Sequence, residues 1–130
     1  MSTTGLFTKH PKKILLFLVI CMLFYGSSLA GEADVIKVDV KKSRKGSFGF
    51  SVTVQHADTG WDHYANKWDI VGEKDVVYGT RILHHPHVGE QPFTRGLYGI
   101  KIPDSVKNVT IRAHDSVHEY GGKVVKVELP

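Results

Sequence analysis

Apolar residues recur at every second position through most of the chain after residue 30. The clearest case is the segment 47–55, in which Phe48, Phe50, Val52 and Val54 alternate with polar or small residues. A period of two places alternate side chains on one face, as in a half-buried β-strand. No segment after residue 30 sustains the 3.6-residue period of an amphipathic helix. The sequence therefore predicts an all-β fold.

Seven strands are expected, separated by turns rich in Gly, Pro and Asp. The expected strands are Ala33 to Val40, Ser47 to Gln55, Tyr64 to Val71, Val76 to Leu83, Phe93 to Ile102, Lys107 to Ala113 and Lys123 to Leu129. Seven short strands in about 100 residues are typical of a single antiparallel β-sandwich.

Residues 1–30 follow a different pattern. Three lysines precede an apolar run from Ile14 to Tyr25, and small residues then lead to Ala30. This order is typical of a secretory signal peptide, and the run is shorter than the roughly 20 residues of a membrane span. We expect a signal peptide at 1–30 with cleavage after Ala30, a β-sandwich domain at 31–130, and export to the periplasm or the medium. An uncleaved anchor is the alternative.

Charge and sulfur content limit the function of the expected mature domain. The chain has 17 basic and 13 acidic residues, and three lysines lie in the expected signal, which leaves 14 basic and 13 acidic residues. This balance gives no support for a nucleic-acid partner. Cys21, Met1 and Met22, the only sulfur-containing residues, precede residue 31. Any metal site must therefore be built from histidines, carboxylates and backbone.

The strand pattern resembles an immunoglobulin or fibronectin type III sandwich. Trp68 falls on the third expected strand, where such folds often bury a tryptophan, and the segment VTIRAHDSVHEYGGKVVKVELP resembles their last hairpin. The chain is also similar to small exported bacterial proteins of uncharacterised function, a similarity that assigns a role to no residue. Because this fold hosts many functions, function has to be argued from sites.

All seven histidines after residue 30 are expected at one end of the sandwich. Successive antiparallel strands alternate in direction, so the second, fourth and sixth connections meet at the same end. We call residues 56–63, 84–92 and 114–120 the histidine end. It contains His56, His63, His84, His85, His87, His114 and His118.

The histidine end predicts a site for a divalent transition metal. Imidazole ligands without thiolates suit Cu(II) or Zn(II). His85 and His87 are expected to bind it with His114 or His118, since alternate residues of an extended segment point the same way. The predicted metal residues are His85, His87, His114, His118, Asp115 and Glu119, the two carboxylates as ligands or as acceptors that orient a ring. In the alternative, the rings are solvated or pair with nearby aspartates.

A metal-independent surface for a protein or a glycan is the second interpretation. Aromatic side chains with polar neighbours form such surfaces. The predicted surface residues are His56, Trp61, His63, His84, Glu90 and Tyr120. No HExxH or CxxC motif is present, so we expect no enzyme. The stretch HDSVH, 114–118, is expected to be a turn whose Asp and Ser bond their own backbone. No membrane span is expected after signal cleavage.

Overall fold

The computed structural model describes residues 31–130, which form one compact unit. The predicted signal peptide and its cleavage after Ala30 lie outside the described residues. Within residues 31–130, no helix has the length and apolar character needed to cross a membrane.

Seven strands make up the unit, each ending within two residues of its expected bounds. They are β1 (Asp34–Lys42), β2 (Phe48–Gln55), β3 (Ala65–Val71), β4 (Val77–Ile82), β5 (Phe93–Ile100), β6 (Asn108–Asp115) and β7 (Val125–Glu128). A short 3-10 turn, η1 (Glu73–Asp75), lies between β3 and β4. The prediction of seven strands is confirmed. The strands end near the expected positions because the turn residues interrupt the period-two pattern where the chain reverses.

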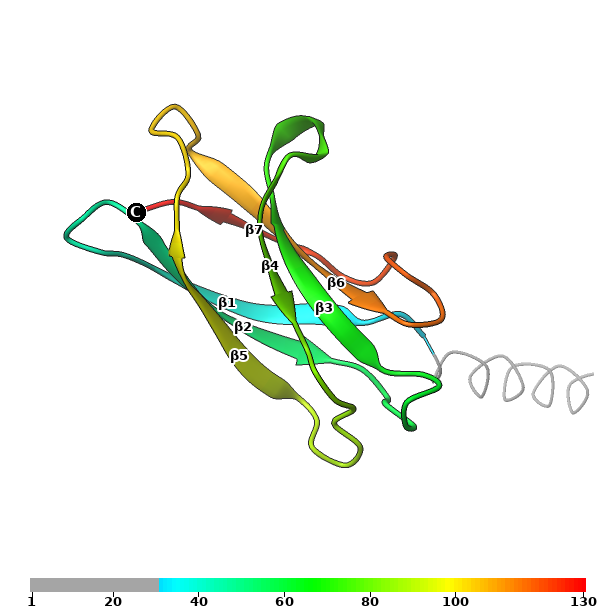
Figure 1. Cartoon of the computed structure of the whole chain (residues 1–130). Helices are drawn as coiled ribbons and strands as arrows, with labels where there is room; N and C mark the ends of the chain where they lie inside the picture. Colours follow the sequence, from blue (N-terminus) through cyan, green and yellow to red (C-terminus); the bar gives the residue numbers. More distant parts are fainter. Residues whose placement is uncertain (1–30) are drawn as a thin grey trace, which may run out of the picture. The chain divides into compact units, whose positions relative to one another are not determined.

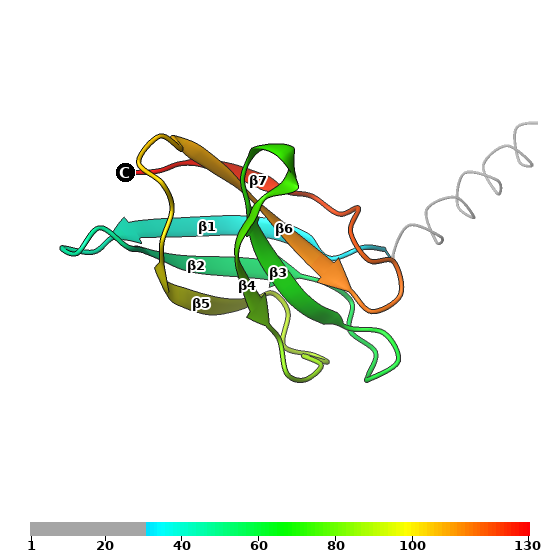
Figure 2. The ribbon, with the colours of Figure 1, turned by 45° about the horizontal axis from the view of Figure 1, so that its top comes forward.

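The strands form two antiparallel sheets that face each other (Figure 1, Figure 2). One sheet has the order β1-β2-β5, and the other has the order β4-β3-β6-β7. Consecutive strands β2 and β3 belong to different sheets, so the connection between them passes from one layer to the other. The all-β antiparallel sandwich predicted from the sequence is confirmed.

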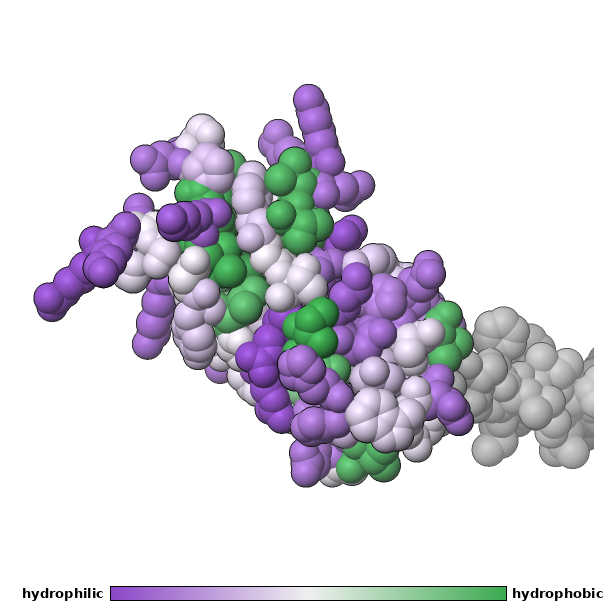
Figure 3. Space-filling view, viewed as in Figure 1, coloured by the Kyte–Doolittle hydropathy of each residue, from purple (hydrophilic) through white to green (hydrophobic). Residues whose placement is uncertain are grey.

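Side chains from the inner faces of both sheets form the core. Along β2, buried and partly exposed positions alternate, as the period of two requires. Trp68 on β3 is fully buried, at 0% exposure, as the resemblance to immunoglobulin-like folds implied. The largest apolar side chains that are fully buried are Trp68, Phe50, Ile70 and Ile111. On the outside, hydrophobic residues form separate patches, one of them over β4 near η1 (Figure 3).

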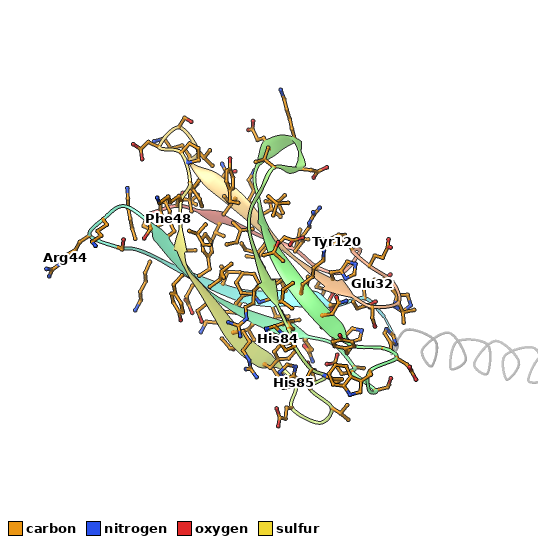
Figure 4. The ribbon with its side chains drawn as sticks, in the orientation of Figure 1. Glu32, Arg44, Phe48, His84, His85 and Tyr120 are labelled. Atoms are coloured by element: carbon orange, nitrogen blue, oxygen red, sulfur yellow. The ribbon has the colours of Figure 1, made fainter. Side chains whose placement is uncertain are left out.

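The β2–β3, β4–β5 and β6–β7 connections meet at one end of the sandwich (Figure 1). Contacts join all three, because the His56 ring reaches Asp115 and the His87 backbone N–H reaches Asp58. Arg44, in the β1–β2 connection, lies at the opposite end (Figure 4). The expectation that alternate connections converge is therefore confirmed.

Replacement of Trp68 tests the packing of this core. We expect Trp68→Ala to lower the free energy of unfolding by about 3–5 kcal/mol, since it removes a fully buried ring and leaves a cavity. Trp61→Ala is the matched control, because Trp61 is 66% exposed and its loss should change stability by less than about 1 kcal/mol. Denaturant unfolding measures both, and equal losses would contradict the assignment of the core.

Candidate metal centre

Asp115, the last residue of β6, is a fully buried carboxylate at the histidine end. Its Oδ1 accepts the backbone N–H of Val117 at 2.8 Å and that of His118. Asp115 and Glu119 exchange backbone hydrogen bonds that close the turn, and Glu119 has a positive φ of 60°. The expectation that the aspartate of HDSVH bonds its own turn is confirmed, and Oδ2 is left for other partners. The same expectation for Ser116 is wrong, because its hydroxyl bonds the backbone of Tyr64 and Asp62 in the β2–β3 connection.

Three imidazole nitrogens surround Oδ2 of Asp115. His56 Nε2 and His118 Nδ1 each lie 3.1 Å from this oxygen, and His63 Nε2 lies 3.4 Å from it. His56 and His63 come from the β2–β3 connection, whereas His118 comes from the β6–β7 connection. We call these four residues the Asp115 cluster.

The donors around Asp115 keep it ionised. Burial raises the pKa of a carboxyl group, but the backbone N–H groups of His118 and Val117 and the rings of His118 and His63 favour the carboxylate more strongly. Together they lower the pKa of Asp115 from 3.8 to about 2. A permanent negative charge therefore lies at the centre of the three rings.

A second carboxylate orients the ring of His56. His56 is buried, and its Nδ1 lies 2.5 Å from Oδ1 of Asp58. Asp58 also accepts the backbone N–H groups of Ala65 at 3.0 Å and His87 at 2.8 Å, so it acts throughout as an acceptor. The proton therefore belongs on Nδ1, which leaves Nε2 of His56 to face Asp115 with its lone pair or a second proton.

The Asp115 cluster reaches solvent through two of its rings. The side chain of His56 is 1% exposed, whereas those of His63 and His118 are 18% and 35% exposed. The His63 ring lies between the other two, at centroid distances of 4.7 Å from His56 and 5.0 Å from His118. The buried carboxylate therefore lies behind two rings that are partly exposed to solvent.

His56, His63 and Asp115 each offer one ligand atom, and these atoms lie within 4.8 Å of one another, so the group can hold a metal ion. Two ligands bound tetrahedrally at about 2.0–2.1 Å are separated by about 3.3–3.4 Å. The distances of 3.1 to 3.4 Å from Oδ2 to the three nitrogens are close to that separation.

His85 and His87, predicted as ligands, lie beside each other but apart from the Asp115 cluster. Their ring centroids are 4.6 Å apart, and His85 is exposed, as is its neighbour His84 (Figure 4). His87 is buried against Phe93, with stacked rings at 4.0 Å, and its Nε2 accepts a hydrogen bond from Arg95 at 2.9 Å. Among the described hydrogen bonds, none joins either ring to Asp115 or to another histidine.

The charge state of His87 follows from its surroundings. Burial, then the positive charge of Arg95 and the neighbouring ring of His85, lower the pKa of His87 below 6.5. The neutral ring accepts from Arg95 through Nε2, so its proton lies on Nδ1, a buried atom without a hydrogen-bond partner among residues 31–130. His87 thus packs and accepts a hydrogen bond where it stands.

His114 lies on the face of β6 opposite the core, away from the Asp115 cluster. Its Nδ1 donates to Asn66 Oδ1 at 2.6 Å, and its ring meets the edge of Tyr120 at 4.8 Å. Burial and the charge of Lys67 lower the pKa of His114. Tyr120 (Figure 4) is in turn fixed by a 2.5 Å hydrogen bond from its hydroxyl to Asp69.

The structure thus divides the residues predicted from the sequence. His118 and Asp115, predicted for the metal, meet His56 and His63, predicted for the binding surface. His85, His87 and His114 lie elsewhere, and the remaining predicted residues are at the surface. Exposed among them are Trp61, His84, Glu90 and Glu119, whereas Tyr120 is partly buried. The sequence signals that could have indicated the cluster are the short spacings His56-x-Asp58 and Asp115-x-x-His118.

Comparison with known proteins gives one curated relative. It is described as "Putative lipoprotein" and comes from Halomicrobium mukohataei; the two sequences are 36% identical over 97 residues. The match covers 75% of this chain, and the chain spans about half (47%) of the length of that relative. No protein-family model matches the chain. No solved structure matches it either.

Outside the Asp115 cluster, the buried Asp69 provides a test of pH-dependent stability. Burial raises its pKa, but hydrogen bonds from Thr80, Tyr120 and Arg112 and the charge of Lys67 bring the pKa below 3.8. The ionised form therefore stabilises the fold above about pH 4, and this stability is lost as the pH falls through the lowered pKa.

We expect Asp69→Asn to reduce the free energy of unfolding by about 1–3 kcal/mol near pH 6, since hydrogen bonds to a charged acceptor are weakened. The difference from the wild type should shrink at a second, acidic pH below 3.8, as the native carboxylate also loses its charge. Urea unfolding at both pH values measures it. An undiminished difference at low pH would contradict the lowered pKa.

Proposed function

We propose that this is an exported, non-enzymatic protein that binds a divalent transition metal, Zn(II) or Cu(II), in the Asp115 cluster. The observation that supports this most strongly is the convergence of three imidazole nitrogens on one buried carboxylate oxygen. One hydrogen-bond donor to Oδ2 of Asp115 would be enough to hold the turn in place. Three histidine rings from two connections instead match the number of protein ligands in a metal site.

The orientation of His56 supports the same function. A metal-bound histidine commonly donates its other ring N–H to a carboxylate, which fixes the tautomer. Asp58 provides such a carboxylate at 2.5 Å from Nδ1, and it directs Nε2 toward Oδ2 of Asp115. Both oxygen and nitrogen ligands are present and no sulfur follows residue 31, which favours Zn(II) or Cu(II) over Cu(I).

The absence of HExxH and CxxC motifs favours binding over catalysis. His56, His63 and Asp115 offer an ion three ligand atoms within 4.8 Å of one another, and His118 contacts the carboxylate of this group. Similarity to a relative described as "Putative lipoprotein" supports export, and we propose that the protein acts in the periplasm or outside the cell. Metal capture or storage there requires no second substrate.

Calorimetric titration with Zn(II) and with Cu(II) tests the proposal. We expect one ion per chain with a Kd below about 1 μM. His63→Ala should weaken binding by about 100-fold or more. Changing a residue that hydrogen-bonds to a metal ligand weakens binding by about 10–100-fold, and loss of the ligand itself should cost more. His85→Ala is the matched control, an exposed histidine of the same end outside the cluster. Equal binding by both variants would refute the assignment.

Metal binding should also stabilise the fold. A ligand that binds only the native state, at about 100 times its Kd, adds about 2.7 kcal/mol to the free energy of unfolding. Thermal unfolding of the metal-free protein with and without zinc measures this gain, and excess chelator should reverse it. An unchanged transition at saturating zinc would contradict binding to the folded cluster.

An exposed tryptophan beside a partly buried tyrosine favours a second candidate function, a metal-independent surface for a protein or a glycan. Trp61 is 66% exposed and meets Tyr64 edge-on at a centroid distance of 5.6 Å. Exposed aromatic rings beside polar groups suit sugar rings and protein side chains alike. This function would be supported if the protein binds to a glycan array in the presence of chelator and the Trp61→Ala variant does not. If the metal titration shows no binding, this function becomes the preferred proposal.

A further inference from the structure

Asp58 connects the Asp115 cluster to the β4–β5 connection, a segment that provides no ligand to the cluster. Its Oδ1 accepts from His56 Nδ1 at 2.5 Å, and its Oδ2 accepts from the backbone N–H of His87 at 2.8 Å. Asp58 is 7% exposed, so water competes little for these bonds. One buried carboxylate therefore joins a proposed metal ligand to the middle of another connection.

Gln91 makes a second, separate link between the same two segments. Its side-chain carbonyl accepts the backbone N–H of His56 at 3.0 Å, and its NH₂ group donates to the backbone carbonyl of His87 at 3.1 Å. This link involves the backbone of His56, whereas Asp58 contacts the ring. Only the Asp58 link therefore depends on what the ring of His56 binds.

The β4–β5 connection presents several exposed side chains beyond these links. His84, His85, Val88 and Glu90 are all exposed, with Val88 at 58%. The backbone N–H of Glu90 bonds the carbonyl of His87 at 3.3 Å, so this turn is built on His87. The position of His87 thus sets how the exposed residues are displayed.

We propose that Asp58 is a positioning residue through which an ion bound at the Asp115 cluster holds the β4–β5 connection, residues 84–90, more firmly. This inference rests on the proposed function. Coordination through Nε2 polarises the imidazole ring and strengthens the hydrogen bond from Nδ1 to Asp58. Asp58 is then held more firmly, and so is its bond to the N–H of His87.

Amide hydrogen exchange resolved by NMR tests this coupling, with zinc as the probe. In the wild type we expect saturating zinc to slow exchange at the amides of His87 and Glu90 about tenfold or more, through a lower population of the open form. Asp58→Asn retains the size of the side chain but removes one acceptor, and it should abolish most of this slowing. It should also weaken zinc binding by about 10–100-fold, so the variants are compared at saturation.

Two further variants separate coupling from mere support of the loop. Asp62→Asn makes the same charge change in the same connection at an exposed side chain, and the slowing should persist. Gln91→Ala removes the link that does not contact the ring, so exchange should rise with and without zinc while the zinc-dependent slowing remains.

The outcomes distinguish the two proposals. Failure of the wild type to bind zinc would refute the proposed function. Zinc binding without slower exchange at His87 would overturn the coupling alone, and the wild-type measurement settles this even if Asp58→Asn does not fold. Full slowing in Asp58→Asn would also overturn it.

Discussion

The buried carboxylate of Asp115 is the interaction on which one end of this protein depends. An isolated ionised carboxylate in a protein interior costs several kcal/mol, so it persists only with donors around it. Here two backbone N–H groups satisfy one oxygen, and three rings meet the other. The local turn, the position of His118 and the convergence of two connections all follow from satisfying this one group.

The fold was largely predictable because it depends on a local pattern. Alternation such as that of Phe48 and Phe50 along β2 directly indicates which face of a strand is buried, and the turn residues indicate where each strand ends. The arrangement of strands into sheets of three and four depends on contacts distant in sequence. Strand direction alone nevertheless predicted which connections share an end, since it needs only the number of strands.

Which histidines belong to the Asp115 cluster was less predictable, because this depends on the direction in which each ring points and on the groups that it contacts. His87 was expected to bind a metal with His85, yet it stacks on Phe93 and accepts from Arg95. His56 follows the apolar alternation of β2 and is drawn inside, where Asp58 orients it. A histidine at the end of a buried face is therefore a stronger candidate for a site than a run of exposed histidines in a loop.

The cluster also joins the two layers of the sandwich. His56 follows β2 in one sheet, and Asp115 ends β6 in the other. In antibody domains, a disulfide links the second and sixth of seven strands beside a buried tryptophan on the third. This domain has no cysteine after residue 30, and Trp68 is buried on its third strand. An ion at Asp115 would act as a cross-link between the layers that contains no sulfur–sulfur bond and that responds to metal supply and acidity.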